Sequence, residues 1–328
     1  QLCMDSSLEA RLWEAEAKIE FLEGRSAASI ELYRRVLHHL VAGSRFLTPE
    51  ACTKLSNFCY VLTQAGLTVE ALRMTDATEA LADPELRKTR EWAALQGCRG
   101  QYLMDAGRLQ EACTALHTWI PRVVGFRRKF FTGMLHAALV LGGSLSIADA
   151  MAIPPRIHSK GLWVVMLSLL GDSPEQLRES GEYLIAVEDE NGVNRTRWST
   201  RAFRFADLLE GKRNSGVTEL MQELKSEAGE SALSVGSRAG LQALLTMYAR
   251  HAQSRSVALR HLRDTHNSIL ETDLANIEIW VQALHAKNAL ALLKRSTGKD
   301  AAIREWGESL LARRVDAGYG MFAELATG

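Results

Sequence analysis

Three glycines recur at a nearly constant interval in the first third of the chain. Gly24, Gly66 and Gly107 stand 42 and 41 residues apart, and each lies between two segments with helix-like apolar spacing. Glycine readily adopts the left-handed conformation that ends a helix. A fixed interval between such turns predicts that the chain folds as repeated pairs of antiparallel helices.

Small residues stand seven positions before and five positions after each turn glycine. These pairs are Ala17 and Ser29, Cys59 and Ala71, and Gly100 and Ala112. Small side chains at both positions let two antiparallel helices approach closely. The segment 100–112 gives the best match to a known pattern, and it resembles the tetratricopeptide repeat.

Weaker copies of the pattern follow the first three. They are centred on Gly143, Gly171 and Gly211, and two more are expected over 241–262 and 279–311. Proline occurs only six times in the whole chain, and β-branched runs typical of strands are missing. We therefore predict an all-α fold, a superhelical solenoid of about eight antiparallel helix pairs. It would form a single elongated domain over residues 1–328, with the clearest repeats at 10–130 and more degenerate ones at 131–328.

The period near 41 residues and the degenerate later copies resemble the superhelical sensor domains of MalT-type bacterial regulators, the large ATP-dependent LuxR family. In that family an ATPase module precedes the repeats and a DNA-binding module follows them. The resemblance covers the repeat region alone. Because the chain starts at Gln1 without an initiator methionine, we expect it to be a fragment of a longer protein. It implies a sensor domain that binds an effector and contributes to transcription regulation.

Charge and cysteine content exclude several classes of protein. Lys+Arg and Asp+Glu both number 39, so no basic excess is present to bind nucleic acid or an anionic membrane directly. The five cysteines include no C-x-x-C pair, which indicates a reducing compartment. The longest apolar stretch, 162–170, is too short to span a bilayer, which needs about 20 residues. With no signal peptide recognised, we expect a cytoplasmic location.

Motifs of common enzymes are missing from the sequence. No G-x-x-x-x-G-K-[ST], G-x-S-x-G or H-E-x-x-H pattern occurs. Cys113 and His117 share a helix face, but a closed metal site needs three or four ligands. We therefore expect no catalytic residue, no metal and no cofactor, and an enzyme with an unrecognised site stays a less favoured alternative.

The repeat register predicts which side chains face the inner surface of the superhelix. Inner positions are expected two, three, six, ten and thirteen residues before each turn glycine. The candidates for a binding groove are Tyr60, Gln64, Gln101, Asp105, Phe130, Trp198, Arg201 and Phe205. Such a groove suits a peptide, a partner protein or a small effector.

Two segments combine basic and aromatic residues, 122–131 and 195–205. One interpretation is that they bind an anionic or flat ligand. The other is that their aromatic side chains pack between helices while the arginines stay solvated. In the second segment we expect Trp198, Arg201 and Phe205 to share the concave surface, with the arginine head accessible.

Together these features predict a non-catalytic binding or sensor domain. The alternative is a scaffold or chaperone-like repeat protein that holds a partner helix.

Overall fold

The computed structural model describes residues 6–42, 46–230, 234–294 and 296–327. This part of the chain is all-α, as the sequence predicts, and no strand occurs in it. The helices are α1 (Ser6–Leu22), α2 (Ser26–Val41), α3 (Pro49–Gln64), α4 (Thr68–Thr78), α5 (Arg90–Asp105), α6 (Leu109–Trp119), α7 (Gly125–Leu141), α8 (Ile147–Ala152), α9 (His158–Gly171), α10 (Pro174–Glu190), α11 (Arg197–Leu209), α12 (Ser215–Ala228), α13 (Val235–Ala252), α14 (Arg255–Leu270), α15 (Ile279–Leu292), α16 (Lys299–Asp316) and α17 (Met321–Thr327). Short 3₁₀ turns join some of them, and one, η4 (Leu274–Asn276), precedes α15.

The turn glycines adopt the conformation that the repeat pattern requires. Gly24, Gly66 and Gly107 have φ of 78°, 76° and 82°. The residue after each glycine donates its N–H to the carbonyl five positions back, as Arg108 does to Leu103 at 2.8 Å. This geometry satisfies carbonyls that the helix end leaves without a partner. The predicted register of the first three turns is therefore confirmed.

The fifth turn differs from its prediction. Gly171 is the last residue of α9, and the left-handed residue is Asp172, with φ of 53°. Aspartate tolerates this region better than most side chains. Arg250 and Lys287 both bind Asp172 Oδ2, at 2.8 and 2.7 Å, and these ion pairs fix the turn against α13 and α15.

Close approach within a helix pair depends on the small residues. A Cβ on Gly100 would lie 2.7 Å from Cγ of Leu116, so only glycine allows α5 and α6 to pack as they do. In the first pair, the hydroxyl of Ser29 donates to the carbonyl of Ala17 at 2.7 Å. Consecutive helices contact one another along the chain, from α1 and α2 to α15 and α16.

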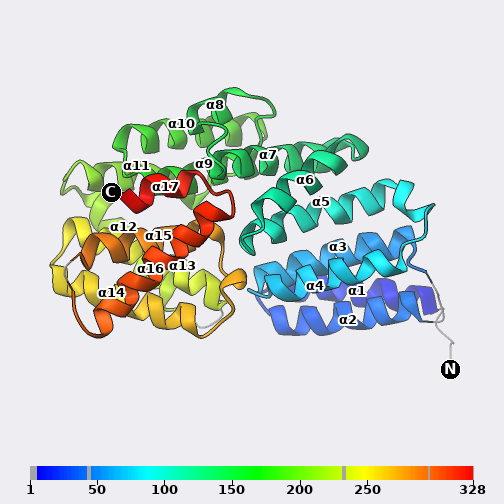
Figure 1. Cartoon of the computed structure of the whole chain (residues 1–328). Coiled ribbons are helices and arrows are strands. Elements are labelled where there is room, and N and C mark those ends of the chain that lie inside the picture. The colour runs from blue at the N-terminus through cyan, green and yellow to red at the C-terminus, as the bar shows by residue number, and fades with distance from the viewer. Residues whose placement is uncertain (1–5, 43–45, 231–233, 295, 328) are drawn as a thin grey trace.

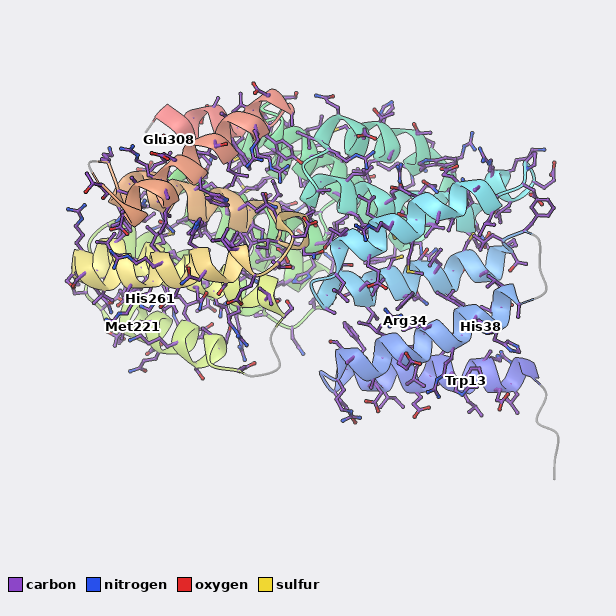
Figure 2. The ribbon with its side chains drawn as sticks, turned by 60° about the horizontal axis from the view of Figure 1, so that its bottom comes forward. Trp13, Arg34, His38, Met221, His261 and Glu308 are labelled. Carbon is purple, nitrogen blue, oxygen red and sulfur yellow. The ribbon has the colours of Figure 1, made fainter. Side chains whose placement is uncertain are left out.

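The C-terminal helices return to the N-terminal half (Figure 1). Asn276 of η4 accepts the N–H of Val69, and the hydroxyl of Tyr319, between α16 and α17, donates to the carbonyl of Met104 at 2.5 Å. Helix α15 also contacts α9, and α17 contacts α7. In Figure 2, α1 and α2, with Trp13 and His38, lie on the side of the molecule away from α12 and α14. The return contacts therefore involve the turns of the early repeats rather than α1 and α2.

Candidate ligand-binding cleft

A cleft opens where the early turns meet the returning helices. Its inner part is a polar recess of about 40 Å³ between the α3–α4 turn, α5, the start of α13 and η4. The recess is lined by Thr63, Gln64, Gly66, Thr68, Gln101, Asp105, Ser234, Gly236, Ser237, Asn276 and Glu278. Three of the eight predicted groove residues, Gln64, Gln101 and Asp105, therefore meet in one recess.

An apolar pocket of about 230 Å³ adjoins the recess. The two share Gly236, Ser237 and Glu278. The pocket is further lined by Met166, Trp198, Glu227, Gly240, Leu241, Leu244, Trp280 and Val281. Trp198 and Trp280 meet edge to face, with ring centroids 5.7 Å apart at 89°. The recess and the pocket together form one cleft with a polar end and an aromatic end.

Asp105 forms the buried wall of the recess. Its residue exposure is 3 %, and its Oδ1 accepts the backbone N–H of Ile279 at 3.3 Å. Burial raises the pKa of Asp105 well above its usual value, and the negative charge of Glu278 raises it further. The hydrogen bond from Ile279 and the charge of Arg314 act in the opposite direction. The hydrogen bond from Ile279 and the charge of Arg314 therefore only partly stabilise the charged form of Asp105.

Glu278 is the second carboxyl and stands between the recess and the pocket. Its side chain accepts the indole N–H of Trp280. Although the residue reaches solvent, the protein around the cleft desolvates it and raises its pKa, against the effect of that hydrogen bond. Neither Asp105 nor Glu278 forms an ion pair with any side chain in the described part of the chain.

Buried polar contacts behind Asp105 hold the cleft in shape. Gln282 donates to the carbonyls of Asp105, at 3.3 Å, and Ile277, at 2.6 Å, and it accepts from Arg314 at 2.6 Å. The Arg314 guanidinium lies directly beneath Gly107, where a Cβ would come within 1.1 Å of Nη1. The α5–α6 turn therefore needs glycine both for its φ and for the space that Arg314 occupies.

The second basic and aromatic segment differs in part from its prediction. Trp198 is half-buried and lines the apolar pocket. Phe205 is fully buried in the core, so it does not face the cleft. The expected accessible head of Arg201 is wrong, because α12 places Glu223 and Glu227 within 2.7 Å of its Nη2 and the side chain is only 5 % exposed.

The remaining predicted groove residues lie outside the cleft. Tyr60 is exposed and meets Phe21 edge to face, with ring centroids 5.8 Å apart. Phe130 is half-buried and packs against Phe126 and Phe131. No described contact brings either residue near Asp105, and their binding role stays a prediction.

The sequence pattern missed Ser237, Asn276, Glu278 and Trp280. They stand at the beginning of helices or in the turn before α15, whereas the inner-face positions were counted back from glycines at helix ends. All four stand more than 130 residues from Asp105 in the sequence, and the Ile279–Asp105 hydrogen bond joins residues 174 positions apart. No local pattern could have indicated that contact.

Metal ligands do not gather in the part of the chain that the structure describes, where no group of three or more His, Cys, Asp or Glu is placed to hold an ion. His266 and His285 form a pair, with Nδ1 and Nε2 3.3 Å apart. Burial, and then the charge of the neighbouring His266, lower the pKa of His285 to about 3, and burial also lowers the pKa of His266, so this pair is neutral at physiological pH. Burial raises the pKa of Cys113, which keeps its thiol protonated.

Among the described residues, none of the helices combines the length and the apolar character that crossing a bilayer requires. Comparison of the chain with protein-family models and with curated proteins finds no match.

Proposed function

We propose that this chain is a non-catalytic effector-binding module, built as a solenoid of about eight tetratricopeptide-like helix pairs in a single domain. The ligand site is the cleft formed by the polar recess and the apolar pocket. One observation carries the proposal: early and late parts of the chain supply opposite walls of the same cleft, Gln101 and Asp105 on one side and Ser237 and Glu278 on the other.

A ligand in such a cleft couples the two walls. It contacts both α5 and the start of α15, so its affinity depends on how closely these helices approach each other. A ligand shifts a conformational equilibrium by its difference in affinity for the two states. Binding would therefore favour the closed arrangement of the C-terminal helices on the early repeats, which is the behaviour of a sensor.

The size of the cleft favours a small effector over a partner helix. The apolar pocket of about 230 Å³ lies just below the range of about 300–1,000 Å³ that drug-sized ligands occupy. The end of α5 at Asp105 is hydrogen-bonded to Ile279 and Gln282 of α15, so a partner helix would have to displace α15 to pack there. A scaffold that holds a partner helix is the alternative, and it would use another surface. In a cytoplasmic regulator of the MalT type, closure of the cleft would be passed on to the neighbouring modules.

The proposal is tested by filling the cleft. Ser237 is exposed at the junction of the recess and the pocket, so Ser237→Trp blocks both without removing a core side chain. Ser256→Trp is the matched control, because each serine lies in the first turn of its helix and its hydroxyl contacts the N-cap serine at 2.9 Å. Thermal-shift screening of a library of small metabolites and peptides identifies ligands of the wild-type protein.

We expect these ligands to stabilise wild type and Ser256→Trp but not Ser237→Trp, and to reduce the radius of gyration in small-angle scattering. Equal stabilisation of Ser237→Trp would show that the site lies elsewhere. A library with no hit on wild type would also count against the proposal.

A further inference from the structure

The charge of the cleft indicates which ligands it can accept. Its lining includes three carboxyl groups, Asp105, Glu227 and Glu278, and no lysine or arginine. Glu227 is neutralised by Arg201 and Arg197. Asp105 and Glu278 have no such partner among the described residues. An anionic ligand would meet two unpaired acidic groups, whereas a cation would be attracted to both.

The aromatic end of the cleft suits a ligand that has both an apolar part and a positive charge. Indole rings bind the apolar part of a ligand, and their faces attract positive charge. Arg201 already lies over Trp198, with its guanidinium carbon 5.3 Å from the ring centroid. Leu241 and Leu244 extend the apolar wall.

The polar lining of the recess favours a compact charged group. Its volume of about 40 Å³ exceeds the roughly 10–15 Å³ that a cavity needs to hold one water molecule, so a small polar group fits. A primary ammonium has three N–H donors and about the size of a water molecule. Its donors would find acceptors on Asp105 and Glu278 and on the amide oxygens of Gln64 and Gln101. A trimethylammonium group carries the same charge but has no N–H to donate to these acceptors.

We propose that the cleft binds a small primary amine in its ammonium form, with the ammonium in the polar recess and an apolar body against Trp198 and Trp280. This inference rests on the proposed function, because it assigns a ligand class to the same cleft. It explains why Asp105, 3 % exposed and without an ion-pair partner in the described chain, forms a wall of the recess. The ammonium would supply the charge that the two carboxyls lack.

The inference is tested by calorimetric titration with matched probes. Hexylamine, 2-phenylethylamine and tryptamine are the amines, and 2-phenylethanol, 3-phenylpropionate and N-trimethyl-2-phenylethylammonium vary the charge and size of the head. We expect at least one amine to bind wild type, and about tenfold tighter than the other three compounds. Glu278→Gln and Asp105→Asn should each weaken the amine about tenfold. Glu271→Gln, an exposed change seven residues before Glu278, should leave it unaffected.

A second readout is the number of protons released on binding. An ammonium favours the charged forms of Asp105 and Glu278, whose pKa values are raised in the free protein, so binding should release protons. Titration in two buffers with different ionisation enthalpies measures this release, and Asp105→Asn should reduce it.

Each other outcome overturns the inference. If none of the amines binds, or if the alcohol, the acid or the trimethylammonium compound binds as tightly, the cleft does not select a primary ammonium. Those outcomes leave the proposed function standing as long as Ser237→Trp still abolishes binding of the library ligands. Loss of that block would instead overturn the proposed function itself.

Discussion

Helix α3 in the N-terminal half and helix α15 in the C-terminal half are both deeply packed, but they bury different side chains. Along α3, the buried positions include Leu55, Phe58 and Leu62, an apolar stripe that faces its neighbours. Along α15, Gln282, His285 and Asn288 are each fully buried among apolar residues. An apolar stripe fixes which face of a helix turns inward, whereas buried polar groups must each find a specific partner. The apolar stripe of α3 can be recognised from its periodic spacing in the sequence, whereas the buried polar residues of α15 fix the one position in which that helix can pack.

The partners of Gln282 show how specific that docking is. Its amide reaches the end of α5, the segment before α15 and Arg314 of α16. Tyr319 adds a hydrogen bond to Met104 from the turn after α16. Apolar packing between neighbours therefore dominates in α3, whereas the later helices contact α5 through buried polar hydrogen bonds.

The largest effect is expected for Gly107→Val compared with Gly24→Val. Both glycines have positive φ, but a Cβ at Gly24 meets nothing within 4 Å, whereas at Gly107 it collides with Arg314. Backbone strain alone should cost about 1–3 kcal/mol at Gly24. At Gly107 the displaced guanidinium adds the loss of its bond to Gln282, for a total of about 4 kcal/mol. Equal losses by urea denaturation would show that Arg314 contributes nothing to the turn.

The sequence predicted the first of these contributions and not the second. Gly143 and Gly211, like the first three turn glycines, have positive φ, because a helix end with this hydrogen-bond pattern is encoded locally. The contact between Gly107 and Arg314 is not local, and no period in the sequence relates the two. The inner-face register did bring Gln64, Gln101 and Asp105 together, since it depends on the same turns. The register predicted an accessible head for Arg201, which is wrong. Glu223 and Glu227, four residues apart on the following helix, could have indicated that the arginine forms ion pairs there.

A smaller effect is expected for Gln282→Leu compared with Asn288→Leu. Gln282 makes contacts to α5, to its own helix start and to Arg314, and removing them leaves several buried groups without partners. Asn288 makes one bond, to the carbonyl of Ala243 at 3.1 Å, and its Oδ1 already lacks a partner. We expect losses of about 3 and about 1 kcal/mol in the free energy of unfolding. A larger loss for Asn288→Leu would mean that α15 is held mainly by α13 rather than by α5.

The next comparison separates Arg201 from Trp198 within one segment. Arg201 is buried with two glutamates, so Arg201→Ala removes two buried ion pairs and should cost about 2 kcal/mol of stability, although each glutamate keeps a second, more exposed arginine. Trp198 is half-buried, so Trp198→Ala should cost only about 1 kcal/mol, less than the 3–5 kcal/mol of a core aromatic.

Affinity should follow the opposite order. Trp198→Ala should weaken a cleft ligand by about 2 kcal/mol, since Trp is a common binding anchor, and Arg201→Ala should change affinity little. Thermal melting and calorimetric titration of both variants check this order. Unchanged affinity in Trp198→Ala would remove it from the site.

The smallest expected effect concerns Asp105 and Asp207, whose contributions to stability should change in opposite directions as pH rises. The pKa of Asp105 is raised in the folded protein, first by burial and then by Glu278. Folding then favours the protonated form, so its contribution is fully present below the unfolded pKa of about 3.9 and is lost as pH rises through the folded pKa. Asp105→Asn removes this dependence and should stabilise the protein increasingly as pH rises above about 4.

Asp207 should behave in the opposite way, and it lies outside the contact between early and late helices. Arg178, Asn214 and Lys212 bind its carboxylate and lower its pKa to about 2, against a desolvation effect that would raise it. Its contribution to stability is therefore present above about pH 4 and is lost as pH falls towards 2. Asp207→Asn should destabilise the protein at neutral pH by less than about 1 kcal/mol, because water screens this partly exposed ion pair. Urea unfolding of wild type and both variants at several pH values between 2 and 8 measures the two trends. Parallel trends would show that Asp105 carries its charge without penalty, and they would remove the electrostatic reason for a cation in the cleft.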